Sequence, residues 1–265
     1  MGVSVTEPGG GSDPSRPETV ARLLEGGAAV VDGLKVFTTN GLYARFLLVH
    51  ARDEASGGNV LVLVDREGGG VEAEDMGVEG YRCSGVARVR YRGARGRLVA
   101  GPGRAAYKLL LEGFARSRLL VAAHASAVAE RLAVGAAEWL MERGRWGFQA
   151  PRHRVARALA LAWAALSLAR EEAGRADASG RVDWARSSAA KYLGAEAASA
   201  ALDAAARAYG GYASLRGSPA LEAAPLVYSL LAAEGTQDIQ LEIISGGVER
   251  SLQLKTSQQR GRGGG

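Results

Sequence analysis

The spacing of apolar residues changes once along the chain, near residue 100, and this change restricts the folds open to it. Before that point apolar residues form short runs or alternate with polar ones, as is typical of β-strands. After Gly101-Pro102-Gly103 they recur every third or fourth position, as is typical of α-helices that bury one face. The pattern predicts an α+β protein: a small antiparallel β-barrel or sandwich over residues 1–101, followed by an antiparallel helical bundle over residues 102–255.

Three segments carry the strand signal. Asp32-Gly33 lies between two apolar runs and predicts a two-residue hairpin turn. The Ser56-Gly57-Gly58-Asn59 turn predicts a second hairpin, between the apolar runs at 46–49 and 60–64. Between residues 87 and 92 apolar residues alternate with arginines, which predicts a half-buried strand with a basic outer face.

Two stripes carry the helical signal. Val155, Leu159, Trp163 and Leu166 share one face of a predicted helix, which we expect to be buried. A second helix repeats small or apolar residues at every fourth position, namely Ala189, Leu193, Ala197, Ala201, Ala205 and Tyr209. Small side chains let helices approach closely, so we expect this helix at the centre of the bundle. Glycine-rich breaks divide the region after residue 101 into four or five helices, and residues 256–265 predict a disordered basic tail.

The amino-acid composition argues against several classes of function. The single cysteine, Cys83, excludes a disulfide framework and indicates a reducing compartment, so a cytoplasmic location is expected. The three histidines lack metal-ligand spacing, and no metal site is predicted. A formal charge of +5 spread over 265 residues is too mild to indicate nucleic acid, but it suits anionic substrates. No uninterrupted apolar run reaches the roughly 20 residues of a membrane span.

Two short segments carry the candidate chemistry. Residues 6–13 read Thr-Glu-Pro-Gly-Gly-Gly-Ser-Asp, a glycine-rich turn with a hydroxyl residue near each end. Such a turn is either a flexible linker or a cradle whose N–H and O–H groups bind a phosphate or a heterocycle. Residues 35–41 read Lys-Val-Phe-Thr-Thr-Asn-Gly and predict a strand that ends in an Asn-Gly turn.

Together these segments resemble two signatures of the acyl-CoA dehydrogenase family, Thr-Glu-Pro-Gly-x-Gly-Ser-Asp and Lys-x-aromatic-x-Thr-Asn-Gly. Further matches follow in the family's order. They are Met76-Gly77, Gly80 to Ser84, Phe114 to Arg118, Glu142 to Gly147, Ala190-Lys191, Gly210-Gly211 and Glu234-Gly235-Thr236. The ordered set spans residues 3 to about 253.

The resemblance implies FAD as cofactor and an acyl-CoA as substrate. Thr6 would bond the pyrimidine edge of the flavin, Phe37 would cover the ring, and Thr39 would lie near its reactive nitrogen. Arg143 would reach the FAD diphosphate of a neighbouring subunit. The full set of implied cofactor contacts is Thr6, Ser12, Phe37, Thr39, Arg143, Trp146, Arg154, Arg207, Gly210, Gly211 and Thr236. The implied substrate contacts are Ser12, Arg118, Glu234 and Gly235.

Glu234 would be the catalytic base of such an enzyme. A carboxylate can remove the weakly acidic α-proton of a thioester while the flavin accepts hydride from the β-carbon. In the family, the backbone N–H of the base residue and a flavin hydroxyl hold the thioester oxygen. From the residues alone, a carboxylate that caps the last helix is the preferred interpretation of Glu234, and it is the ordered set of family motifs that favours the base.

Several departures from the family leave two function classes open. Only Met1 to Val5 precede Thr6, where the family has a helical domain, and Arg154 and Arg207 stand where it commonly has glutamines. One class is a dehydrogenase subunit that works with a separate helical subunit and passes electrons to an electron-transfer flavoprotein or a similar acceptor. The other is a non-catalytic structural or regulatory subunit. A homo-oligomer is expected in both cases.

Overall fold

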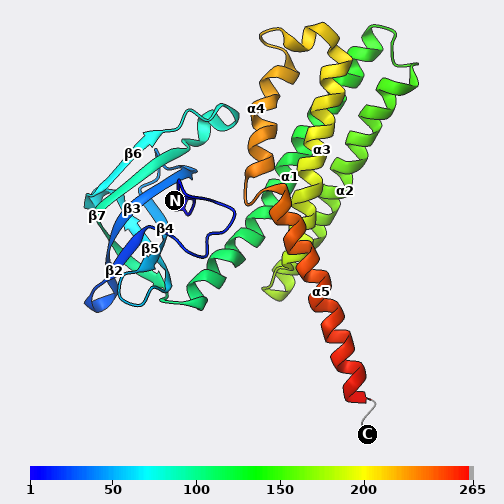
Figure 1. Cartoon of the computed structure of the whole chain (residues 1–265). Coiled ribbons are helices and arrows are strands. Elements are labelled where there is room, and N and C mark those ends of the chain that lie inside the picture. The colour runs from blue at the N-terminus through cyan, green and yellow to red at the C-terminus, as the bar shows by residue number, and fades with distance from the viewer. Residues whose placement is uncertain (263–265) are drawn as a thin grey trace. The chain divides into compact units, whose positions relative to one another are not determined.

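The computed structural model describes residues 1–262, with side chains described for residues 1–253. Strands fill the first hundred residues, and five α-helices follow (Figure 1). The chain divides into two compact units, Met1–Gly113 and Phe114–Gly265. This arrangement confirms the predicted α+β class, in which a β-domain precedes a helical domain.

The first unit is built on a closed ring of strands. Hydrogen-bonded pairing runs from β4 to β2, β3, β7 and β5 and returns to β4, while β1 adds to β4 and β6 adds to β7. The pairings are antiparallel except that β1 and β2 both run parallel to β4. The strands are β1 (Gly2–Ser4), β2 (Val20–Leu23), β3 (Ala28–Thr38), β4 (Phe46–Asp53), β5 (Asn59–Asp65), β6 (Val71–Asp75) and β7 (Ala87–Ala100).

Alternating side chains of these strands form the core inside the ring. In β7 the side chains of Val89 and Tyr91 are buried, whereas the alternating Arg88, Arg90 and Arg92 are exposed, as the sequence predicted. The β4–β5 hairpin around residues 56–59 is also confirmed. The Tyr91 hydroxyl, deep in this core, hydrogen-bonds Ser4 Oγ at 2.8 Å and so satisfies its polar tip.

The hairpin predicted at Asp32-Gly33 is wrong. These residues lie inside the continuous strand β3, at a register shift against β7 between Val31 and Gly33. A Cβ at Gly33 would lie 2.4 Å from Thr19 Oγ1, so glycine is needed here for a close backbone approach. Asp32 accepts a hydrogen bond from Gly93 N–H at 2.7 Å. The Asp-Gly pair therefore forms an irregularity that bends a long strand.

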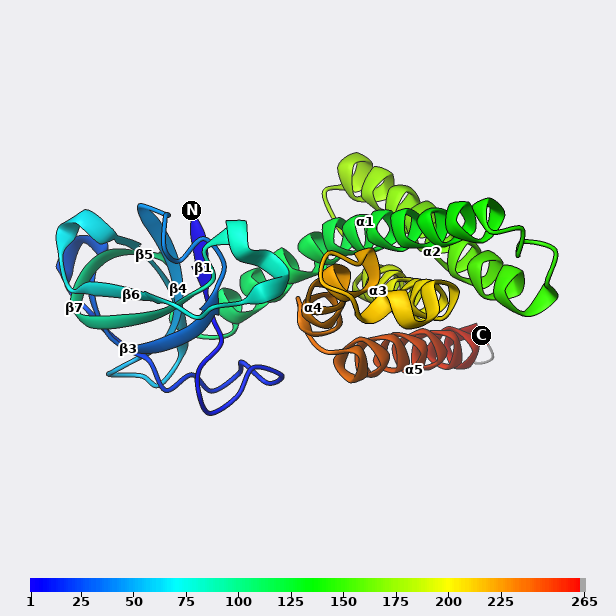
Figure 2. The ribbon, with the colours of Figure 1, turned by 90° about the horizontal axis from the view of Figure 1, so that it is seen from above.

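The second unit is a helical bundle with α3 at its centre. α3 packs against α2, α4 and α5, and Figure 2 shows it between α2 and α5. Four residues of the predicted stripe are buried, namely Ala197, Ala201, Ala205 and Tyr209. Gly194, outside that stripe, also allows close helix contact, because a Cβ there would lie 2.9 Å from Ala122 O on α1. The helices are α1 (Arg104–Glu142), α2 (Gln149–Ser179), α3 (Trp184–Tyr209), α4 (Pro219–Ala232) and α5 (Gln237–Arg262).

Local sequence explains where these helices begin and end. Asp183 Oδ1 accepts hydrogen bonds from the N–H groups of Ala185 and Arg186, which caps the start of α3. Pro219 occupies the first turn of α4, where its missing N–H is harmless. Gly180 ends α2 with φ at +69°, the left-handed conformation common at helix C-termini.

The prediction that one apolar stripe of α2 is buried is wrong in one respect. Val155 is buried as expected, but the rest of the buried face consists mainly of alanines, such as Ala158, Ala162 and Ala165. Trp163 is 55% exposed. Close packing against α3 favours small side chains at the contact, so the largest residue of the stripe lies outside it.

The boundary between the two compact units falls inside α1, after Gly113, because the first turns of this helix belong to the core of the β-domain. Ala106 and Leu110 are buried, and the Tyr107 ring lies 6.2 Å from the His50 ring. The disordered tail expected at residues 256–265 stays a prediction. α5 continues to Arg262, while side chains from residue 254 onward and residues 263–265 lie outside the described part.

Within the described residues, α1 alone has the length and apolar composition that a membrane crossing requires. Its most apolar 18-residue window has a mean hydropathy of 1.3, and 44% of that window is buried inside the protein.

Candidate functional site

A buried ion pair joins the two signature segments of the first unit. Lys35 Nζ lies 2.8 Å from Glu7 Oε1, and the Lys35 side chain is fully buried. Lys35 also donates to Val5 O at 2.8 Å, and Val36 N–H donates to Thr6 O at 2.9 Å. The glycine-rich segment is therefore held against β3 at its start, which excludes a freely flexible linker for residues 5–7.

Glu7 is ionised in this setting. Burial alone would raise its pKa, but hydrogen bonds from Lys35, Glu18 and Thr19, together with the Lys35 charge, lower the pKa to about 2. Glu18 N–H donates at 2.6 Å and Thr19 N–H at 2.8 Å. Burial lowers the pKa of Lys35, while the Glu7 carboxylate raises it. The pair is thus a structural anchor with its charges satisfied.

The candidate flavin contacts of this unit lie on and beside that anchor. Thr6 is half-buried and Ser12 is exposed, both in the loop between β1 and β2. Phe37, at the end of β3, is 59% exposed, has φ at +53° and donates its N–H to Met76 Sδ at 3.1 Å. Thr39 follows β3 and is exposed. Positive φ is strained for an aromatic residue, and such strain often marks a functional position.

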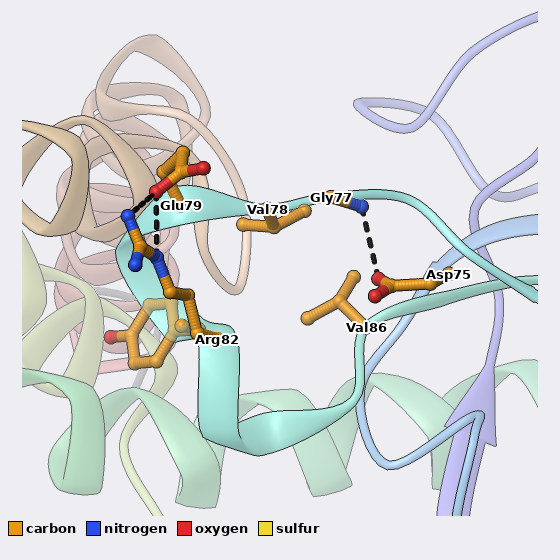
Figure 3. A pocket seen from close by; sticks show the side chains of 7 residues that line it. Asp75, Gly77, Val78, Glu79, Arg82 and Val86 are labelled. Carbon is orange, nitrogen blue, oxygen red and sulfur yellow. Dashed lines mark hydrogen bonds and ion pairs between the residues drawn. The ribbon is translucent and has the colours of Figure 1, made fainter.

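A pocket of about 360 Å³ lies at another place on this unit (Figure 3). It is bounded by the end of β6, the 3-10 turn at Glu79–Ser84 and the start of β7. Glu79 and Arg82 form an ion pair on its rim. None of the candidate flavin contacts described above lines this pocket. Its lining residues are Asp75, Gly77, Val78, Glu79, Tyr81, Arg82 and Val86.

In the second unit, Glu234 lies in the short loop between α4 and α5. It has φ at +56°, a rare conformation for a residue with a side chain, and Gly235 follows at +99°. Its Oε2 is buried without a hydrogen-bond partner among the described residues. Buried carboxylate oxygens are nearly always paired, so an orphan one indicates a group that waits for a ligand or a proton.

Three side chains hold the carbonyl groups of this loop. Arg118 Nε donates to Glu234 O at 3.1 Å, and Gln240 Nε2 donates to the carbonyls of Glu234 and Gly235 at 3.1 and 3.0 Å. Lys191 Nζ donates to Leu231 O and Gly235 O at 3.0 and 2.9 Å. Within the described residues, the Glu234 N–H donates no hydrogen bond, so it is available to an oxygen of a ligand.

The electrostatics of the loop suit a base. Burial raises the pKa of the Glu234 carboxyl, against the opposing effects of Ser117, Arg118 and Lys191. Burial also lowers the pKa of Arg118 and Lys191, the latter to about 8. A raised carboxyl pKa moves this group toward the range in which it can accept and return a proton near neutral pH.

A second candidate cluster surrounds Arg143, just after α1. Its guanidinium lies 4.0 Å from the ring centroid of Trp139 and 4.9 Å from that of Tyr212. Trp139 and Tyr212 also pack edge to face, with centroids 5.4 Å apart. The stack fixes an exposed cation against Tyr212, which follows Gly210 by two residues. Gly210 has φ at +57°, and a Cβ added there would meet nothing within 4 Å.

The remaining predicted cofactor contacts lie at exposed or half-buried positions of the second unit. Trp146 is half-buried in the connection between α1 and α2, and Arg154 is exposed on α2. Arg207 is exposed on α3 and donates to Asp203 at 2.8 Å, one turn back on the same helix. Gly211 is the second residue of the 3-10 turn that follows α3, and Thr236 is half-buried directly before α5.

The Glu234 and Arg143 clusters lie far apart within one chain. Arg118, which contacts the Glu234 loop, and Arg143 lie 25 residues apart on and just beyond α1. At about 1.5 Å per residue this separation is roughly 37 Å. Figure 1 shows the α1–α2 and α4–α5 connections well separated along the bundle.

Four residues at these sites were given no role from the sequence: Glu7, Lys35, Lys191 and Gln240. The signal for Lys191 was present, since it is one lysine on a face of alanine, serine and glycine that is buried all along α3. A cation on such a face must find buried oxygens. The partners of Glu7 lie 11 to 28 residues away, and no local pattern marks them.

Comparisons with known proteins agree with this picture. Residues 2–93 match the family model "Acyl-CoA dehydrogenase, middle domain", and residues 107–248 match "Acyl-CoA dehydrogenase, C-terminal domain". The second match alone covers more than half of the chain.

Among curated relatives, "Probable acyl-CoA dehydrogenase FadE10" of Mycobacterium tuberculosis is 34% identical over 161 residues, which are 57% of this chain and 24% of that protein. Cyclohexane-1-carbonyl-CoA dehydrogenase of Geobacter metallireducens is 31% identical over 147 residues, or 53% of this chain and 37% of that protein. The chain thus spans well under half the length of these relatives.

Solved structures give the same result for the fold. A probable acyl CoA dehydrogenase of Mycobacterium abscessus superposes with a TM-score of 0.83 at 29% identity, over 93% of this chain and 68% of that one. The butyryl-CoA dehydrogenase of Megasphaera elsdenii superposes at 0.84 with 23% identity, over 93% and 67%.

Proposed function

The chain belongs to the acyl-CoA dehydrogenase family, and on that basis we propose that it carries out FAD-dependent α,β-dehydrogenation of an acyl-CoA thioester. The observation that carries the proposal is the Glu234 loop. A carboxylate oxygen is buried there without a partner, on a residue in a strained conformation, with three side chains that tie down the surrounding carbonyls. A carboxylate that only capped a helix would be expected to bond the first N–H groups of α5.

In the proposed reaction, Glu234 takes the α-proton of the thioester. The carboxylate is poised for this step because burial raises its pKa, and its free backbone N–H is a donor for the thioester oxygen on which negative charge develops. Arg118 and Gln240 hold the carbonyl of Glu234 and so keep this N–H and the side chain in a set direction. FAD, when bound, accepts the hydride from the β-carbon.

The residues of the first unit fit a flavin. A flavin ring needs hydrogen-bond partners at its edge and an apolar surface at its face. The exposed Thr39 hydroxyl and the half-buried Thr6 can supply the first, and the exposed Phe37 ring can supply the second. The Glu7–Lys35 anchor holds the backbone of both segments.

Replacing Thr39 with valine should weaken FAD binding. The change keeps the shape and removes one hydroxyl, which leaves a buried cofactor atom unpaired at roughly 1 to 3 kcal/mol, or about 5- to 150-fold in the dissociation constant. Calorimetric titration of the apoprotein with FAD measures the change. Equal affinities for the two proteins would remove Thr39 from the site.

Assembly is part of the proposal. Large apolar side chains are exposed on the bundle, among them Leu120, Phe148, Trp163 and Tyr228. Such surface favours association. The roughly 37 Å between the Arg143 and Glu234 clusters means that Arg143 would serve a flavin beside the Glu234 of a second copy rather than its own. We therefore propose a homo-oligomer in which each site takes Arg143 from a neighbour.

Mixed oligomers test this arrangement. Arg143→Ala and Glu234→Gln should each be inactive alone, but co-assembly should restore activity. In a randomly mixed dimer population, about a quarter of the sites would join an intact Glu234 to an intact Arg143 from the partner. Flavin reduction by the co-expressed pair, compared with each parent, measures the effect. No recovery in a mixture shown to contain both chains would contradict the shared site.

A non-catalytic subunit remains the second candidate, and one observation favours it. Arg207, which stands in place of a cofactor-binding glutamine of the family, pairs with Asp203 on its own helix. A protein that holds no flavin after purification from its native source would support this alternative. A separate helical subunit and an electron-transfer flavoprotein or similar acceptor stay predictions, and the polypeptides that accompany the native protein would test them.

A further inference from the structure

Lys191 is a fully buried lysine whose three hydrogen bonds all go to the segment that carries Glu234. Its Nζ donates to Leu231 O at 3.0 Å, Gly235 O at 2.9 Å and Gln237 Oε1 at 3.0 Å. Within the described residues it forms no ion pair with a carboxylate. Three oxygens within seven residues of chain thus take up every proton of the ammonium group.

A buried cation of this kind is expensive unless something offsets its desolvation. Burial, followed by the charge of Arg118, lowers the pKa of Lys191 to about 8, while the Glu234 carboxylate opposes the shift. The three oxygens that accept its hydrogen bonds are all neutral. An alanine or methionine would pack on this face of α3 at less expense, so the packing of the bundle does not explain a lysine.

The conformation of the Glu234 loop explains why a lysine is buried at position 191. Glu234 and Gly235 both have positive φ, and this turns the carbonyls of Glu234 and Gly235 inward toward the bundle. Inward carbonyls need donors. Arg118 of α1 and Gln240 of α5 supply them to Glu234 O, while Gln240 and Lys191 of α3 supply them to Gly235 O. Lys191 is the donor that reaches across the loop, from the end of α4 to the start of α5.

We propose that Lys191 is a positioning residue for Glu234, which holds the loop in its strained conformation and sets the charge that the carboxylate faces. The inference deepens the proposed function and rests on it. Lys191 makes no hydrogen bond to the Glu234 carboxyl and so takes no proton in the reaction. The other charged group that acts on the Glu234 carboxyl is Arg118. On the far side of Gln237 lies the carboxylate of Glu196, which accepts a hydrogen bond from Gln237 Nε2 at 3.2 Å.

The test compares Lys191→Met with the wild-type chain, and Lys108→Met serves as the matched control. Lys108 is an exposed lysine of α1, 3.7 Å from Glu112. The expected result for Lys191→Met is a kcat roughly 10- to 100-fold lower with KM nearly unchanged, because small displacements of a reacting group have effects of this size. The rise of kcat with pH should also move to higher pH, since removal of a nearby positive charge raises the pKa of Glu234. Lys108→Met should match the wild-type protein in both respects.

Hydrogen exchange at residues 233–236 supplies a readout that does not depend on turnover. Faster exchange in Lys191→Met alone supports the positioning role. Unchanged exchange, together with an unchanged kcat and pH profile, overturns it. If the wild-type protein reduces no flavin, the proposed function fails, and the exchange data decide whether Lys191 fixes the loop. If Lys191→Met does not fold, Lys191→Gln is measured in the same way, because glutamine keeps hydrogen-bond donors but has no charge. A kcat and a pH dependence of kcat equal to those of the wild type would overturn the proposal.

Discussion

Replacing Glu234 with glutamine should leave the protein folded and able to bind FAD and acyl-CoA, yet nearly unable to reduce the flavin. Glutamine keeps the shape and can still accept hydrogen bonds, but it cannot take up a proton. General base catalysis contributes roughly 100- to 10,000-fold, and more where no water replaces the base. Stopped-flow absorbance after anaerobic mixing with an acyl-CoA measures the loss.

Glu222→Gln is the matched control for this experiment. Glu222 is an exposed carboxylate in the first turn of α4, on the helix that leads to the Glu234 loop. The control should reduce its flavin at the wild-type rate. If Glu234→Gln also reduces flavin at that rate, Glu234 is a capping residue and the site assigned to the loop is wrong.

Replacing Glu7 with glutamine should be the most destabilising change considered for the first unit. The substitution leaves the buried Lys35 ammonium without its counter-ion, which costs roughly 3 to 5 kcal/mol in comparable buried pairs. Urea-induced unfolding of the two proteins gives the difference in the free energy of unfolding. The exposed Glu25 provides a matched control, and Glu25→Gln should change that free energy by less than about 0.5 kcal/mol.

The same pair predicts part of the acid sensitivity of the fold. Folding lowers the pKa of Glu7 from its ordinary value of 4.5 to about 2. Its ionised form therefore stabilises the folded state above pH 4.5, and this contribution, about 3 kcal/mol, is lost as the pH falls toward 2. In Glu7→Gln the free energy of unfolding should fall less steeply over that interval. Parallel curves for the two proteins would show that Glu7 is not ionised in the folded state.

The parts of the fold that local pattern predicts correctly are those in which neighbours in sequence decide the structure. The alternation around Val89 and Tyr91 and the turn between β4 and β5 depend on a few adjacent residues. The hairpin prediction at Asp32-Gly33 was wrong because the same dipeptide occurs both in hairpin turns and in bends within a strand. The choice depends on Thr19, which packs against Gly33 from a distant part of the chain. Trp163 misled because α3, with its small residues, leaves no room for it.

The candidate site shows the same division. Position along the family's motifs located Glu234, and the structure adds that it lies in a strained loop with a buried, unpaired oxygen. Of the residues that hold this loop, the family's motifs assigned a role to Arg118 alone. Lys191 and Gln240 were given none, because they reach the loop from two other helices. Which buried cation faces which carbonyl is a property of the folded bundle and cannot be read from spacing along the chain.

Whether the chain is a flavin-dependent dehydrogenase can be read from the absorbance spectrum of the protein purified in its native assembly, recorded before and after anaerobic addition of acyl-CoA thioesters of different chain length. We expect an oxidised flavin spectrum that bleaches with at least one thioester, together with formation of the corresponding enoyl-CoA. A protein that carries no flavin and takes none up when FAD is supplied would contradict the proposed function.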